Sequence, residues 1–148
     1  MPKELVADSR MILLIEDNPG DVRLMKEALR DSGLQVAIEV APDGDEAVRF
    51  LNRQSPHEKA RRPSLIFLDL NLPKGTSKEI LRYIKSSPEL RSIPIAVLTS
   101  SDAERDIREA YDLHANCYLR KPVDLDSFIA TISAAMKFWL GIACIPHE

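Results

Sequence analysis

The chain has 148 residues, of which 45% are hydrophobic and 29% charged, with a formal net charge of -3. This length suits one domain that can build a core without a disulfide or a metal, and the slight acidity argues against a nucleic-acid-binding face. The two cysteines lack metal-ligand spacing, the N-terminus lacks the blocks of a secretory signal, and no apolar run approaches a membrane span, so we expect a cytoplasmic protein with reduced thiols.

The first third of the chain alternates between strand-like and helical patterns. Residues 11–16 form an apolar run that ends in carboxylates, as expected of a short buried strand. A helix follows from Pro19, a residue tolerated in the first turn, to near Gly33. A second strand is predicted over Val36–Ala41, and a second helix begins at Asp43 and continues to Leu51.

The middle of the chain repeats this alternation after a connection, Gln54–Pro63, that has no apolar period. Leu65–Leu68 is a four-residue apolar run closed by Asp69 and reads as a buried strand. A helix over Ser77–Ser86, a strand over Ile95–Leu98 and a helix over 102–113 follow in order. The middle segment therefore supplies two further strand and helix pairs.

A short strand, Cys117–Leu119, leads into the last predicted helix, for which Asp124 is a suitable N-cap. Apolar residues on one face of that helix extend to Trp139. The following segment, 138–145, is more apolar than a terminal tail. It either contacts a second copy of the protein or folds back over the domain's own core.

Five strand and helix pairs predict an α/β fold of one domain over 1–148, with a short N-terminal and an apolar C-terminal extension. The expected architecture is a flavodoxin-like, doubly wound parallel sheet with strand order 2-1-3-4-5. In such sheets the functional site lies outside the carboxyl ends of the strands. The residues at those ends are therefore the candidates for function.

The strand ends carry groups suited to a phosphoryl site: Glu16, Asp17, Asp69, Thr99 and Lys121. Three neighbouring carboxylates need a cation, and Mg2+ prefers such oxygen ligands. Asp69, beside a divalent ion and a lysine, can attack a phosphoryl group and become an aspartyl phosphate.

We assign the other groups around this acceptor. Asp17 would bind the metal directly and Glu16 directly or through water. Asn71 would offer its backbone carbonyl. Thr99 and Lys121 would hold the transferred phosphoryl oxygens. Taken singly, each of these residues also has an ordinary structural explanation, such as a turn, a helix cap or a strand position.

From about residue 10 to 140 the chain resembles the receiver domain of two-component response regulators. The resemblance is carried by an acid pair, an acceptor acid, a threonine and a lysine followed by proline: Glu16-Asp17, Asp69, Thr99 and Lys121-Pro122. The resemblance implies a phosphoryl group taken from a phosphohistidine on a sensor histidine kinase, Mg2+ dependence and slow self-catalysed loss of the phosphate. It also implies that Thr99 moves toward the phosphate, that Tyr118 turns inward and that the Lys121–Pro122 bond is cis.

Four short stretches resemble more closely the small response regulators that serve bacterial and cyanobacterial phytochrome kinases: residues 18–24, 113–118, 121–125 and 138–140. This resemblance implies a phytochrome as phosphodonor. It also implies a homodimer built on the face of the fourth helix, fifth strand and fifth helix, with the C-terminal segment a further candidate contact. One departure is Ser77, eight residues after the acceptor, where receivers often carry glycine, with Gly75 two residues earlier.

The leading hypothesis is therefore a stand-alone phosphoryl-accepting switch that is not an enzyme and has no attached output domain. An alternative is a Mg-dependent phosphatase or phosphotransferase that also forms an aspartyl phosphate. Such enzymes commonly need a second acid just after the nucleophile, where this chain has Leu70 and Asn71. A flavin-binding electron carrier shares the fold order, but the chain lacks a Gly/Ser/Thr-rich phosphate loop after the first strand.

Overall fold

Five parallel strands form one sheet in the order β2-β1-β3-β4-β5 in the computed structural model, which describes residues 9–73 and 76–146. The strands are β1 (Met11–Ile15), β2 (Ala37–Ala41), β3 (Leu65–Asp69), β4 (Ile95–Thr99) and β5 (Cys117–Arg120). The predicted flavodoxin-like strand order is confirmed. Because all strands run parallel, their carboxyl ends meet at one edge of the sheet.

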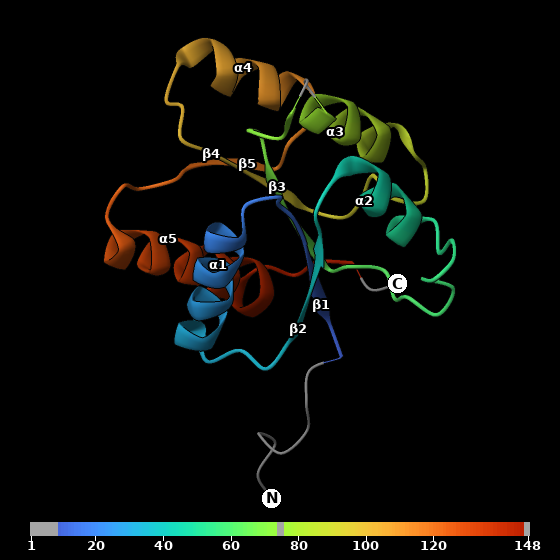
Figure 1. The fold of residues 1–148 in the computed structure, drawn as a ribbon, viewed down its shortest axis with the longest axis horizontal. Helices are drawn as coiled ribbons and strands as arrows, with labels where there is room; N and C mark the ends of the chain where they lie inside the picture. Colours follow the sequence, from blue (N-terminus) through green and yellow to red (C-terminus); the bar gives the residue numbers. More distant parts are fainter. Residues whose placement is uncertain (1–8, 74–75, 147–148) are drawn as a thin grey trace, which may run out of the picture.

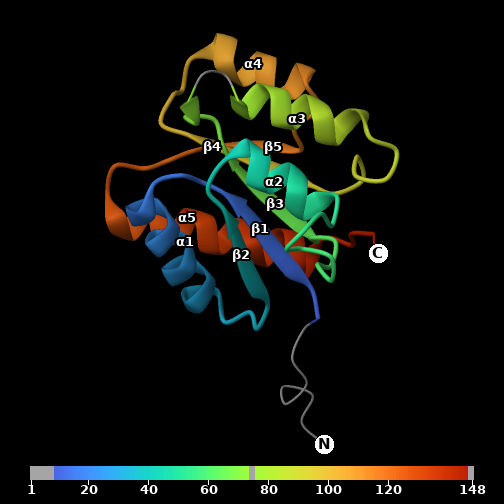
Figure 2. The same cartoon turned by 45° about the vertical axis from the view of Figure 1, so that its right-hand side comes forward.

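Helices cover both faces of the sheet, as a doubly wound fold requires (Figures 1 and 2). One face carries α1 (Pro19–Ser32) and α5 (Leu125–Lys137), which lie side by side; the other carries α2 (Gly44–Leu51), α3 (Thr76–Ser86) and α4 (Glu104–Asp112). β1, β3 and β4 are buried along their whole length, whereas β2 and β5 form partly exposed edges. This burial explains why the central strands read as continuous apolar runs.

The core is divided into two layers by the sheet. Successive strand residues point to opposite faces, so Leu13 and Ile15 pack with the α2 and α3 layer while Ile12 and Leu14 pack with α1 and α5. Each layer thereby buries the apolar side of its own helices.

Most element boundaries differ from the predicted ones by one or two residues. β1 ends at Ile15, so Glu16 lies just beyond the strand, although its N–H still donates to the Ala41 carbonyl at 3.1 Å. Asp43 is the N-cap of α2 rather than its first residue, and its side chain accepts from the Glu46 N–H. Asp124 caps α5 as predicted, accepting from the Ser127 N–H at 2.9 Å.

The apolar C-terminal segment folds back over the protein's own core for part of its length. It continues α5 as a π-helical segment, η3 (Phe138–Ile142), in which Leu140 is buried and Trp139 packs against the α1 and α5 layer. The Arg10 guanidinium donates to the Leu140 carbonyl at 2.7 Å. Phe138 and Ile142 remain exposed, so these two side chains are available to a partner.

The continuous helical stretch Leu125–Ile142 is long and apolar enough, by length and composition alone, to cross a membrane. The expectation that no apolar run approaches that length is therefore wrong. The stretch also contributes Phe128, Ile132 and Met136 to the core beside α1. This packing accounts for part of its apolar character, since 28% of the stretch is buried.

Candidate functional site

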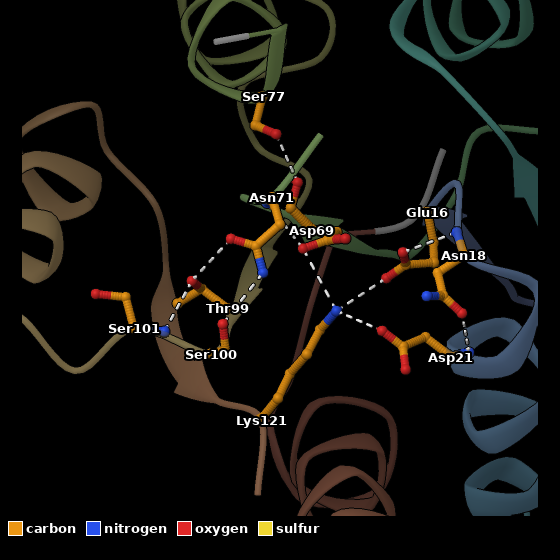
Figure 3. Close-up of polar contacts among 10 residues, drawn as sticks. All are labelled: Glu16, Asn18, Asp21, Asp69, Asn71, Ser77, Thr99, Ser100, Ser101 and Lys121. Atoms are coloured by element: carbon orange, nitrogen blue, oxygen red, sulfur yellow. Dashed lines mark hydrogen bonds and ion pairs between the residues drawn. The ribbon is translucent and has the colours of Figure 1, made fainter. Parts of the chain in front are cut away.

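The sheet brings most of the predicted site residues to its carboxyl edge, where Figure 3 shows Glu16 and Asp69 beside the Lys121 ammonium. Asp69 is the last residue of β3 and Thr99 the last of β4. Glu16 follows β1, and Lys121 follows β5 with its N–H donating to the Thr99 carbonyl at 2.7 Å. Residues up to 105 positions apart thus share one small site.

Three carboxylates form a cluster that could hold a metal ion. One oxygen from each of Glu16, Asp17 and Asp69 lies within 4.8 Å of the others. Glu16 and Asp69 are 1% and 2% exposed, whereas Asp17 is exposed to solvent. This donor set fits a hard divalent cation that keeps several waters, because the ligands are all oxygens and one side of the cluster is open.

The electrostatics of Glu16 also indicate that the cluster needs a cation. Burial, the hydrogen bond with Asp69 and the charge of Asp69 raise the pKa of Glu16 to about 8, against the opposing effects of the Lys121 charge and the Asn18 N–H. Without a metal the cluster therefore retains a proton at neutral pH. A divalent cation can replace that proton and satisfy the buried oxygens.

Lys121 makes three ion pairs with carboxylates at once. Its Nζ lies 2.7 Å from Asp21 Oδ2, 3.2 Å from Glu16 Oε2 and 3.4 Å from Asp69 Oδ1. Burial alone would lower the pKa of Lys121, but the hydrogen bond to Asp21 and the nearby negative charges outweigh burial and raise it. The ammonium therefore stays charged beside the predicted acceptor.

Asp21 is a site residue that the sequence analysis missed. It lies in the first turn of α1, after the N-cap Asn18. No pattern in the sequence indicated its role, because an acid in the first turn of a helix is common. Its pairing with Lys121, 100 residues away, depends on how α1 packs beside the end of β5.

Asn71 lies between Asp69 and Thr99. Its backbone N–H donates to Asp69 Oδ1 at 2.9 Å, and its side-chain oxygen is 3.5 Å from Thr99 Oγ1. Thr99 is buried, and its hydroxyl oxygen accepts from the Ser101 N–H at 3.1 Å. Asn71 thus adjoins the acceptor through its N–H; the assignment of its carbonyl as a metal ligand stays a prediction.

Ser77 holds the backbone of the predicted acceptor. Its buried hydroxyl donates to the Asp69 carbonyl at 2.5 Å (Figure 3). The departure from glycine at this position therefore adds a contact to the acceptor strand. Gly75, two residues earlier, lies outside the described residues.

Tyr118 joins β5 to the turn that follows β4. Its hydroxyl donates to the Ser101 carbonyl at 2.8 Å, and its N–H donates to the Tyr111 hydroxyl at 3.2 Å. The ring is partly buried against the core. Tyr118 thus contacts the turn that follows Thr99, and its switching role stays a prediction.

The expected cis bond between Lys121 and Pro122 is wrong. Among residues 9–73 and 76–146 the cis peptide bond joins Ser55 to Pro56, and Lys121–Pro122 is trans. Trans is the lower-energy form of an X-Pro bond. With this bond trans, Lys121 still reaches all three carboxylates, so its placement in the site does not need the cis form.

Comparison with known proteins identifies a family. The model of the response regulator receiver domain matches residues 12–133. Response regulator Rcp1 of Synechocystis sp. is 41% identical over 137 residues, covering 93% of each chain.

Two solved structures agree with this match. The phosphorylated cyanobacterial phytochrome response regulator RcpA has a TM-score of 0.88 at 42% identity, covering 94% of this chain and 99% of that one. The Mn2+-bound form of Rcp1 has a TM-score of 0.86 at 41% identity, covering 93% and 99%. The acid cluster lies at the sheet edge, and the family match covers most of the chain. The chain therefore belongs to the receiver domains of response regulators.

Proposed function

We propose that this chain is a stand-alone response regulator that accepts a phosphoryl group on Asp69 from a phosphohistidine of a sensor histidine kinase. The observation that carries the proposal is the buried Asp69 carboxylate, which shares a 4.8 Å cluster with two acids and lies 3.4 Å from the Lys121 ammonium. A carboxylate in that setting has a place for a cation and a fixed positive charge beside it. Both are what a phosphoryl acceptor needs.

In the proposed transfer, an Asp69 carboxylate oxygen attacks the phosphorus atom. The bond between phosphorus and the donor histidine nitrogen breaks, its electron pair stays on that nitrogen, and a new oxygen–phosphorus bond forms on Asp69. Lys121 and the Thr99 hydroxyl hold the transferred phosphoryl oxygens. Glu16, Asp17, Asp69 and the Asn71 carbonyl would hold Mg2+, which when bound neutralises charge on the phosphoryl oxygens.

The site favours a phosphoryl switch over a phosphatase or phosphotransferase. The residues after the acceptor are Leu70 and Asn71, and Asn71 presents its backbone N–H to Asp69 Oδ1. Neither side chain can act as a general acid or base. The aspartyl phosphate would therefore last long enough for partners to recognise it.

We propose a phytochrome as the phosphodonor. RcpA, 42% identical to this chain, is a cyanobacterial phytochrome response regulator, and RtBRR, 38% identical, is a bacteriophytochrome response regulator. The chain would act in the cytoplasm, where sensor kinases present their phosphohistidine.

We also propose that the output is a change in partner or in a homodimer. Large exposed apolar side chains occur in α4, at the start of α5 and in the connection between β5 and α5: Tyr111, Leu125 and Val123, at 47%, 60% and 97% exposure. Tyr118 of the edge strand β5 contacts the turn after β4. A shift of Thr99 toward a phosphate would therefore be transmitted through Tyr118 to the α4, β5 and α5 face.

Phosphotransfer from purified sensor kinases tests the function. A kinase carrying labelled phosphohistidine is mixed with the wild type and with Asp69→Asn in the presence of Mg2+. The proposal expects rapid transfer from a phytochrome kinase to the wild type only. Equal labelling of the two proteins would reject Asp69 as acceptor, and rapid transfer from another kinase alone would reject the phytochrome assignment.

Sedimentation tests the dimer. Substituting Val123 and Leu125 with aspartate should shift the protein toward monomer if the α4, β5 and α5 face is the contact. Substituting the exposed Phe138 and Ile142 with serine tests the C-terminal segment, while the buried Leu140 stays in place. Unchanged sedimentation of both variants would reject the proposed dimer surfaces.

A further inference from the structure

The shortest ion pair of Lys121 is with a residue outside the candidate metal cluster. Asp21 Oδ2 lies 2.7 Å from the ammonium, closer than Glu16 or Asp69 (Figure 3). The clustered carboxylates that could share a cation are Glu16, Asp17 and Asp69. Lys121 therefore has one anionic partner that a bound cation would leave free.

Asp21 is held in this position by the start of α1. Its N–H donates to the side-chain oxygen of Asn18, the N-cap, at 3.1 Å. A carboxylate in the first turn is also favoured by the helix dipole. The Asp21 side chain is 27% exposed and that of Lys121 11% exposed, so their contact lies at the rim of the site with limited access to water.

While the metal is absent, the Lys121 ammonium lies within 3.4 Å of carboxyl oxygens of Asp21, Glu16 and Asp69. Glu16 and Asp69 are also among the carboxylates that would coordinate a cation. When they coordinate a divalent ion, that ion repels Lys121, and Asp21 remains as the partner of the ammonium. Asp21 thus stabilises the metal-bound state more than the metal-free state.

The same contact acts against the phosphoryl group. The transferred oxygens on Asp69 need the Lys121 ammonium, whereas Asp21 attracts that ammonium toward α1. The negative charge of Asp21 also repels an anionic donor as it approaches the acceptor. One carboxylate therefore has opposite effects on the two steps.

We propose that Asp21 is a positioning residue for the Lys121 ammonium. By attracting that ammonium toward α1, Asp21 strengthens divalent-cation binding at the acid cluster and slows phosphoryl acceptance on Asp69. This inference rests on the proposed function of Asp69. In this proposal a residue of α1 controls the rate of phosphorylation without touching the reacting atoms.

The test compares the wild type with Asp21→Asn, which keeps the shape of the side chain and removes its charge. Mn2+ is titrated as the probe, with free Mn2+ followed by electron paramagnetic resonance, and Mg2+ is then measured by competition. Removing one carboxylate charge near a divalent ion should weaken binding by roughly five- to tenfold. The initial rate of phosphorylation by acetyl phosphate, at Mg2+ saturating for each protein, should rise by about two- to fivefold.

Asp45→Asn is the matched control, because Asp45 is an exposed acid in the first turn of α2 at the same edge of the sheet. It should leave both quantities within twofold of the wild type. Asp21→Ser provides a second uncharged side chain and should reproduce both changes of Asp21→Asn.

The inference is overturned if Asp21→Asn leaves metal affinity unchanged, or if the phosphorylation rate at saturating Mg2+ stays constant or falls. Equal changes in the Asp45 variant would also overturn it, since they would show a general charge effect. Failure of the wild type to become labelled on Asp69 would reject the proposed function instead. The Mn2+ titration distinguishes these outcomes, because it requires no phosphoryl transfer.

Discussion

The buried Glu16 should make the stability of the metal-free protein depend on pH. Its pKa is raised from 4.5 to about 8 in the folded protein, where it is 1% exposed. The folded state therefore holds a proton that the unfolded state releases between these values. Stability contributed by the protonated group is complete below pH 4.5 and is lost as pH rises toward 8.

The size of this loss follows from the pKa difference. At 1.36 kcal/mol per pH unit, the free energy of unfolding should fall by about 2 kcal/mol between pH 6 and pH 8. The Glu16→Gln variant keeps the shape of the side chain but does not titrate. The free energy of unfolding of the wild type minus that of the variant should therefore decrease by about 2 kcal/mol over this range, or roughly 4–8 °C in melting temperature.

The assay is thermal or urea unfolding of both proteins in EDTA at several pH values. Taking the difference between the two proteins removes the contribution of the three histidines, which both share. Saturating Mg2+ should reduce the pH dependence of the free energy of unfolding of the wild type, because the bound metal would hold Glu16 ionised. Parallel curves for the wild type and the variant in EDTA, or a difference that grows with pH, would refute the account of the acid cluster.

Three further substitutions test the packing of the fold. Ser133 Oγ is buried and has no hydrogen-bond partner within the described part of the chain, so Ser133→Ala should stabilise the protein by about 1 kcal/mol in urea unfolding; a destabilised variant would contradict this. A Cβ on Gly44 would lie 2.7 Å from Thr76 Cγ2, so Gly44→Ala should destabilise the protein by about 1–2 kcal/mol, and an unchanged melting temperature would show that α2 and α3 can separate. Ser77→Ala removes the hydrogen bond to the Asp69 carbonyl and should cost about 1 kcal/mol of stability in urea unfolding, whereas equal stability would mean that this contact contributes nothing.

The fold could be predicted from the sequence because the central strands are buried on both faces. β1, β3 and β4 read as apolar runs, and their ends then located Glu16, Asp69 and Thr99 at one edge. The position of Lys121 was predicted in the same way, from the end of β5. In a parallel sheet these placements depend only on local patterns and on strand order.

The features that were missed depend on contacts between distant segments. Asp21 is an ordinary first-turn acid until α1 packs near Lys121. The burial of Leu140 depends on how the chain continues past α5 and on the Arg10 contact. The Lys121–Pro122 bond was expected to be cis from resemblance alone, and an X-Pro pair in a sequence does not specify its isomer.

Site mapping after chemical phosphorylation shows whether Asp69 receives the phosphoryl group. The protein is incubated with acetyl phosphate with and without Mg2+, and the modified residue is located by mass spectrometry of its peptides. We expect one phosphoryl group, on Asp69, that requires Mg2+ and is absent in Asp69→Asn. Modification at another residue, or undiminished modification of Asp69→Asn, would contradict it.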